Sequence, residues 1–125
     1  MKKRARNFEE LEAEVMIKVS NRVKQIHPVV EHIVKNLAEL DFILFIRVLP
    51  EYIQASNEVT EGRIKIPITE PHHSTAVGIY LIIDIEYKNI QFYEITSAIK
   101  GCGGKMVDAV LKALPQDWKG FVVMD

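Results

Sequence analysis

The sequence contains a single cysteine, Cys102, so no disulfide can form within one chain. Chains without disulfides are typical of reducing compartments, and we therefore expect a cytoplasmic protein. The formal net charge is only −1, which gives the whole molecule no electrostatic preference for nucleic acid or for an anionic membrane. These scarcities exclude an internal disulfide scaffold and give no indication of a nucleic-acid or anionic-lipid partner.

Long apolar runs are also missing. The longest span 42–46 and 79–83, whereas a helix needs about 20 apolar residues to cross a bilayer. The basic start of the chain leads into charged residues and not into an apolar signal core, so we predict no targeting segment and no membrane partner. With 125 residues, 48% of them hydrophobic, the chain 1–125 is predicted to form a single domain with one core.

Two amphipathic helices are predicted in the first third of the chain. Asn7 and Glu10 have the spacing of a capping box, and apolar residues then recur at steps of three and four over 8–26. Pro28 suits the first turn of a second helix, which is predicted to end near Leu40. The apolar positions of the two helices are Phe8, Leu11, Val15, Val19, Val23 and Ile26, then Val30, Ile33, Val34 and Leu37.

Strand signals begin after the second helix. The run 42–49 fits a buried strand or further helix, and its length and Pro50 favour a strand. Residues 51–62 are mixed and polar, which predicts a loop with a helical turn. Isoleucines then alternate with other residues over 64–68, and Pro67 places this predicted strand at a sheet edge.

The second half of the chain has the clearest pattern. Val77–Tyr87 and Ile90–Ala98 predict an antiparallel hairpin with a turn at Lys88-Asn89. A glycine-rich loop, a helix and a strand over 121–124 follow. The predicted fold class is α/β of the α+β kind, with N-terminal helices packed on a mainly antiparallel sheet and a strand–Gly-x-Gly–helix–strand unit.

The glycine-rich loop, 100–105, precedes the predicted helix directly. The first N–H groups of a helix lack internal partners and lie at the positive end of its dipole, and glycine lets a phosphate approach them. A P-loop is excluded, because Ile99 stands where glycine is needed and Met106 where serine or threonine is needed. Met106 also replaces the third glycine of a Rossmann fingerprint, although Asp125 ends the next strand. A tight turn without a ligand is the structural alternative.

Residues 76–125 resemble motif A of the GNAT family, the acetyl-CoA-dependent N-acetyltransferases. In that family an antiparallel hairpin leads into an (Arg/Gln)-x-x-Gly-x-(Gly/Ala) loop, then a helix and a strand. Gly101 and Gly103 match the two glycine positions, and residues 106–107 match the hydrophobic pair that opens the helix. Ala98 departs from the pattern, because arginine or glutamine is usual there.

The resemblance implies acetyl-CoA as cofactor and transfer of its acetyl group to an amine of a small molecule or a protein. It implies that the loop amides bind the pyrophosphate, while the preceding strand binds the pantetheine arm and polarises the thioester. The alternative function is a non-catalytic module of this fold that binds a partner or an anion through the loop. The implied cofactor-binding residues are Ile95, Thr96 and Ser97 on the strand, and Ile99, Lys100, Gly101, Cys102, Gly103, Gly104 and Lys105 in and beside the loop.

Two parts of the family's fold are not predicted from this sequence. In the family a strand precedes the helices, and the acceptor half follows the last strand. Here no strand is predicted before Phe8, and the sequence stops at Asp125. Three explanations stay open: a chain truncated at its C-terminus, a degenerate member of the family, or a fold completed by the N-terminal helices and a second chain, as in a homodimer.

Acetyl transfer to an amine requires a group that takes a proton from it. A turn at Lys88-Asn89 pairs Ile83 with Glu94 and places Glu94 on an otherwise apolar face, where burial would raise the pKa of its carboxyl. Glu94 is therefore the candidate base, unless a register shift of one residue places it in solvent.

Other reactive side chains are predicted to have ordinary roles. We expect Cys102 to be a small structural residue of the loop. His27 and Glu31, one helical turn apart, are expected to form a surface pair. Residues 70–73 contain a glutamate and two adjacent histidines, which we expect to be solvated in a loop, so no metal site is predicted.

Overall fold

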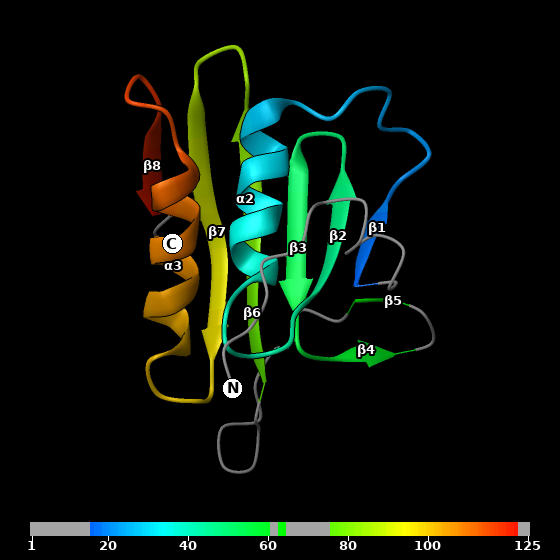
Figure 1. Cartoon of the computed structure of the whole chain (residues 1–125), viewed down its shortest axis with the longest axis vertical. Coiled ribbons are helices and arrows are strands. Elements are labelled where there is room, and N and C mark those ends of the chain that lie inside the picture. The colour runs from blue at the N-terminus through cyan, green and yellow to red at the C-terminus, as the bar shows by residue number, and fades with distance from the viewer. Residues whose placement is uncertain (1–15, 61–62, 65–75, 123–125) are drawn as a thin grey trace.

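A computed structural model of the chain describes residues 16–60, 63–64 and 76–122 (Figure 1). The described part is an α+β fold in which a six-stranded mixed sheet, ordered β1-β2-β3-β6-β7-β8, carries two helices on one face. The elements of this layer pair are β1 (Ile17–Val19), α2 (Pro28–Ala38), β2 (Phe45–Leu49), β3 (Tyr52–Ser56), β6 (Val77–Asp84), β7 (Asn89–Ser97), α3 (Cys102–Ala113) and β8 (Lys119–Val122). The short strands β4 (Val59–Thr60) and β5 (Arg63–Ile64) form a separate ribbon.

The middle of the sheet is antiparallel and its two flanks are parallel. Strands β2, β3, β6 and β7 pair antiparallel in succession, whereas β1 pairs parallel with β2 and β8 pairs parallel with β7. Each parallel pair is connected through one helix, α2 or α3. The predicted α+β class is confirmed, and the sheet is more mixed than predicted. Neither helix in these described ranges is long and apolar enough to cross a membrane.

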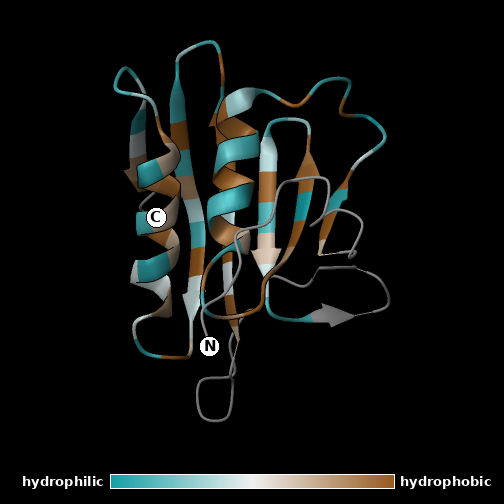
Figure 2. Ribbon diagram, viewed as in Figure 1, coloured by the Kyte–Doolittle hydropathy of each residue, from teal (hydrophilic) through white to brown (hydrophobic). Residues whose placement is uncertain are grey.

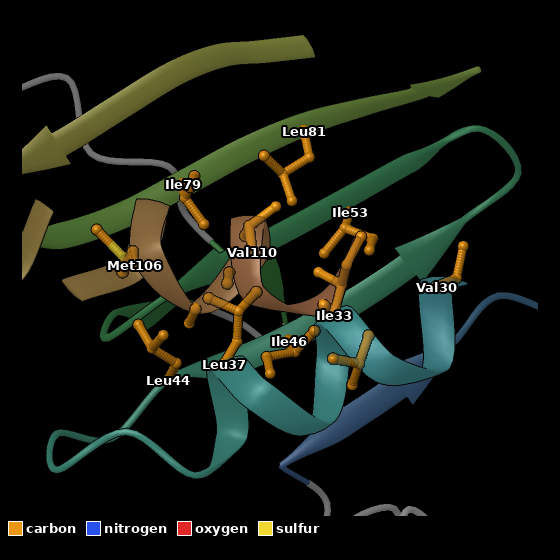
Figure 3. Close-up of a cluster of buried hydrophobic side chains, with 14 of the residues drawn as sticks. Val30, Ile33, Leu37, Leu44, Ile46, Ile53, Ile79, Leu81, Met106 and Val110 are labelled. Atoms are coloured by element: carbon orange, nitrogen blue, oxygen red, sulfur yellow. The ribbon is translucent and has the colours of Figure 1, made fainter. Parts of the chain in front are cut away.

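The hydrophobic core lies between the helices and the sheet (Figures 2 and 3). Side chains alternate along each strand, so every second residue of the central strands faces the helices. Burying one isoleucine or leucine side chain contributes about 1.5–3 kcal/mol, which makes this layer the main source of stability. Its fully buried members include Ile33 and Leu37 from α2, Met106 and Val110 from α3, and Ile46, Ile53, Ile79 and Leu81 from the sheet.

Two predicted elements are wrong in the part that the structure describes. The predicted helix 8–26 falls partly outside the described residues, and Ile17–Val19 is a strand that pairs with β2. Residues 51–62 contain strand β3 and not a loop, because Ile53 and Ala55 point into the core with the period of a strand. Glu51, with a φ of 69°, makes the tight turn between β2 and β3.

Several other elements agree with the sequence. Helix α2 covers the second predicted helix, the run 42–49 contains β2, and α3 follows the glycine loop. Strand β8 is found at Lys119–Val122, and the remainder of the predicted strand 121–124 lies outside the described residues. Only Arg63–Ile64 of the predicted edge strand is described, and residues 70–73 lie outside the described ranges.

The β6–β7 hairpin exists with a different register. Asp84 pairs with Asn89, so residues 85–88 form a four-residue turn where a two-residue turn was predicted. The Asp84 carboxylate accepts a hydrogen bond from the Tyr87 N–H at 3.0 Å, and Lys88 adopts a positive φ of 53°. These local contacts place the turn at residues 85–88, whereas the sequence indicated the dipeptide Lys88-Asn89.

Candidate functional site

The loop between β7 and α3 is a close turn whose conformation depends on glycine. Gly101 caps α3 with a φ of 90° and has no side chain to offer a capping hydrogen bond. This left-handed conformation costs an L-residue about 1–2 kcal/mol, whereas glycine adopts it freely. The Cys102 N–H donates to the Ile99 carbonyl at 3.2 Å, and the Lys105 N–H donates to the Gly101 carbonyl at 3.2 Å.

Ser97 braces this loop from the last position of β7. Its hydroxyl donates to the Ile99 carbonyl at 2.6 Å and accepts from the Gly103 N–H at 3.1 Å. A Cβ on Gly103 would lie 3.2 Å from the Ser97 Cβ, so this glycine permits the close approach of the two segments. The hydroxyl therefore satisfies one of the helix-start amides that the sequence assigned to a phosphate.

Gly104 is different from the other two glycines of the loop. It lies at an ordinary helical φ, and a Cβ built there would meet nothing within 4 Å. Its N–H has no hydrogen-bond acceptor among the described residues. Neither the backbone conformation nor the packing of α3 requires glycine at this position.

The two lysines of the loop have different partners. Lys105 forms an ion pair with Asp41, whose carboxylate oxygens lie 3.0 and 3.3 Å from its Nζ. Lys100 is exposed and forms no ion pair with any residue that the structure describes. The first turn of α3 contains no acidic residue. An anion at this end of α3 would meet positive potential from Lys100 and from the helix.

Strand β7 continues beyond its described pairing with β8 and leads to the loop. The two strands pair over Asn89–Phe92, and the described part of β8 ends at Val122, opposite Phe92. A β-bulge interrupts the pairing with β6, because Phe92 lies opposite Leu81 while Glu94 lies opposite Tyr80. Bulges leave backbone groups unpaired. The bulge therefore lies on β7 between its pairing with β8 and the glycine loop.

The structure corrects the predicted surroundings of Glu94. Ile83 pairs with Ile90, and Glu94 lies half-buried on the sheet face that the helices do not cover. Relative to the predicted pairing, the longer turn shifts β7 by four residues along β6. This shift alone would leave Glu94 on the core face. The bulge at Tyr93 adds one residue and turns Glu94 to the opposite face. The predicted burial of this carboxylate among apolar side chains is therefore wrong.

Three tyrosines form a row beside Glu94 on this open face. The ring of Tyr80 lies 5.6 Å from that of Tyr52 and 5.4 Å from that of Tyr93. Burial, and next the neighbouring Tyr52, raise the pKa of Tyr80 above its ordinary value, so its phenol is a neutral hydrogen-bond donor at physiological pH. This row was not predicted from the sequence. The available signal was the alternation along β6, where Tyr80 stands between buried apolar residues and therefore faces the other side of the sheet.

Other sequence predictions for reactive residues have plain outcomes. The Cys102 thiol is buried in the core, in agreement with a structural role. His27 is the N-cap of α2, where its Nδ1 accepts from the Val29 N–H at 3.1 Å, and this role was not predicted. Within the described ranges, no three residues of the metal-binding types gather into a possible metal site.

The comparisons with known proteins found no match to this chain. No protein-family model, no curated protein and no solved structure matches the chain.

Proposed function

We propose that the chain is a GNAT-like N-acyltransferase that binds acetyl-CoA and transfers the acetyl group to an amine. The observation that supports this proposal is the continuity of two features, because β7 continues past Phe92, its last described pair with β8, and leads through the bulge into the glycine loop. An extended arm with amide groups is suited to a strand edge, and a pyrophosphate is suited to the start of a helix.

The donors present fit such a ligand, although there are fewer than the sequence indicated. Gly104 offers an N–H without an acceptor, and Lys100 offers an unpaired charge within the described residues. The Gly103 N–H is held by Ser97 and contributes only after that bond is exchanged. We expect the phosphates to contact Gly104 and Lys100 first.

The order of elements supports the same proposal. A strand that the sequence did not predict, β1, precedes helix α2, and the β6–β7 hairpin is followed by α3 and a parallel β8. The resemblance of residues 76–125 implies the order from the hairpin to the last strand, and the family also has a strand before its helices. We propose that the six-stranded sheet is the core of a GNAT-like domain.

The chain's own residues have two chemical tasks in this proposal, while acetyl-CoA supplies a reactive thioester. Backbone groups freed by the bulge at Tyr93 polarise the thioester carbonyl through hydrogen bonds. Glu94 takes the proton from the amine as it approaches across the open face. Because Glu94 lies on the sheet face that the helices do not cover, the amine can reach it without crossing the core.

A non-catalytic module is the second candidate function. The bond between Ser97 and the Gly103 N–H favours it, because a loop already closed by its own side chain retains few donors for a large cofactor. In that case the loop binds a simple anion or the charged group of a partner, and Glu94 has no catalytic role.

Calorimetry with acetyl-CoA, CoA and inorganic pyrophosphate tests the binding step. Gly104→Glu is the sharpest variant, because a side chain there meets nothing within 4 Å and a glutamate suits the first turn of a helix. We expect its affinity for CoA to fall at least about tenfold, since charge repulsion replaces attraction, with unchanged or higher stability. Gly104→Gln, which has the same size without the charge, is the matched control.

Turnover separates the two candidate functions. Glu94→Gln is expected to abolish most acetyl transfer to a panel of amines while leaving CoA affinity intact. Binding of CoA without transfer to any amine favours the non-catalytic module. No heat and no thermal shift at millimolar acetyl-CoA would sink the cofactor proposal.

A further inference from the structure

A second candidate site lies at the other end of the sheet. A pocket of about 290 Å³ opens where the N-terminus of α2, the β2–β3 turn and the end of β6 meet. In Figure 1 this is the upper end of the molecule, and the glycine loop is at the lower end. Strand β6 spans the distance between them, which is about 20 Å for Val77–Asp84. The pocket is therefore separate from the proposed cofactor site.

The walls of the pocket are apolar. Val30, Val48 and Ile83 are buried core residues that line it, and Val23 and Ile26 complete the walls from the segment before α2. A water molecule occupies about 30 Å³ in the liquid, so the pocket holds about ten groups of that size. A hydrocarbon body of this size would be removed from water by the same surfaces that stabilise the core.

The rim of the pocket is positively charged. Arg22 and Lys24 line it, both are exposed, and neither forms an ion pair with a described residue. Glu51 is the single acidic residue among the lining residues, so the balance is one positive charge. An anionic group at the rim would meet two cations that form no ion pair with a described residue, and a net lining charge of one positive unit.

Two N–H donors accompany these charges. The Nδ1 of His27 accepts the capping bond from Val29, so in the neutral ring the Nε2 carries the proton. His27 lines the pocket, and so does Val30, whose backbone N–H has no acceptor in the part of the chain that the structure describes. Both donors suit an oxygen acceptor that brings no proton of its own.

We propose that this pocket binds a small carboxylic acid with an apolar body of up to about ten non-hydrogen atoms in total. The hydrocarbon part lies against Val30, Val48 and Ile83, and the carboxylate lies at the rim near Arg22 and Lys24. An amine would face repulsion from these two cations, and an uncharged ligand would leave them without a partner. This inference does not depend on the proposed acyltransferase function.

The protein contains its own reporter for this pocket. Trp118 is the single tryptophan of the chain, it is buried, and its ring lies 5.8 Å from that of His27. Titration with octanoate, which has about the size of the pocket, is expected to change the Trp118 fluorescence saturably. Line broadening of the octanoate NMR signals provides a second readout that does not depend on the tryptophan.

Charge variants test the recognition of the carboxylate. The Arg22→Ala/Lys24→Ala protein is expected to bind octanoate about tenfold more weakly, because charge-assisted contacts are lost, and to bind 1-octanol as before. Lys18→Ala/Lys112→Ala removes two exposed cations elsewhere and is the matched control, with unchanged octanoate affinity expected. Circular dichroism confirms that each variant is folded.

Four outcomes overturn the proposal. Octanoate produces no saturable fluorescence change and no line broadening at millimolar concentration; or 1-octanol binds as tightly as octanoate; or octylammonium binds more tightly than either, through Glu51; or the folded Arg22→Ala/Lys24→Ala protein retains full affinity. Tighter binding of octanoate than of both analogues, lost in this variant alone, supports the proposal.

Discussion

The two helices have similar lengths and lie side by side on the same face of the sheet, and they begin in different ways. Helix α2 starts with His27, whose side chain accepts from the Val29 N–H, and with Pro28, which has no N–H to satisfy. Helix α3 starts with Gly101, which has no capping side chain, and continues through Gly103 and Gly104. The capping acceptor of α2 comes from its own N-cap residue, and the acceptor at the start of α3 comes from Ser97 of the preceding strand.

This difference separates structural glycines from a glycine without a structural reason. The positive φ explains Gly101, and the contact with Ser97 explains Gly103. Gly104 has neither reason, although a glycine within a helix costs about 1 kcal/mol relative to alanine. The proposed ligand would account for a glycine at this position, because the ligand would approach the backbone closely.

The largest expected effect tests whether the two helices contribute equally to the core after their different starts. Ile33→Ala in α2 and Met106→Ala in α3 each remove a fully buried side chain from the same core. Each is expected to lower the free energy of unfolding by about 2–5 kcal/mol in urea denaturation. If one variant is as stable as the parent protein, the two helices do not share one core.

Substitution of the two N-caps tests the difference itself. Gly101→Ala is expected to lower stability by about 1–2 kcal/mol, because alanine must adopt a φ of 90°. His27→Ala is expected to cost about 1 kcal/mol, because the Val29 N–H loses its acceptor. Thermal and urea unfolding measure both values. An unchanged stability of Gly101→Ala would mean that the turn is not held in this conformation.

Gly104→Ala gives a smaller effect of the opposite sign. The substitution is expected to raise the free energy of unfolding by about 0.5–1 kcal/mol, because alanine favours the helix and meets nothing within 4 Å. The same variant is expected to bind CoA more weakly if the phosphates contact this backbone. Higher stability with unchanged CoA affinity would give the glycine no ligand role.

The smallest expected effect concerns an ion pair that connects the β6–β7 turn to the residues after α3. The Lys88 Nζ donates to Asp117 at 2.7 Å, and this bond lowers the pKa of the Asp117 carboxyl below 3.8. The contribution is therefore present above pH 3.8 and is lost as the pH falls through the lower, folded-state pKa. Asp117→Asn is expected to flatten this part of the acid unfolding profile slightly, since both side chains are exposed.

The sequence predicted the elements whose signals are local and repeated. Helix α2 follows from the spacing of Val30, Ile33 and Leu37, and α3 follows from the glycine loop and its apolar face. Strand β3 was missed because its five residues carry only two apolar core positions, Ile53 and Ala55. Strand β1 was assigned to a helix because Ile17–Val19 is too short to establish a period.

The site was less predictable than the fold, because it depends on contacts between segments. The loop was found from its composition, but the bond from Ser97 to Gly103 depends on how β7 enters the turn. The face of Glu94 depends on the bulge, and no residue type near Tyr93 announces one. The pocket beside His27 joins three elements distant in sequence, so no single stretch carries its signal.

The bulge also has a genetic consequence. Phe92 pairs with Leu81 and Glu94 with Tyr80, so Tyr93 is one residue more than β6 requires. An in-frame deletion of codon 93 would leave each remaining pair of this ladder with its present partner. Such an allele should encode a folded protein with a straight strand in place of the bulge. The deletion would remove Tyr93 and the bulge, and it would leave Glu94 opposite Tyr80.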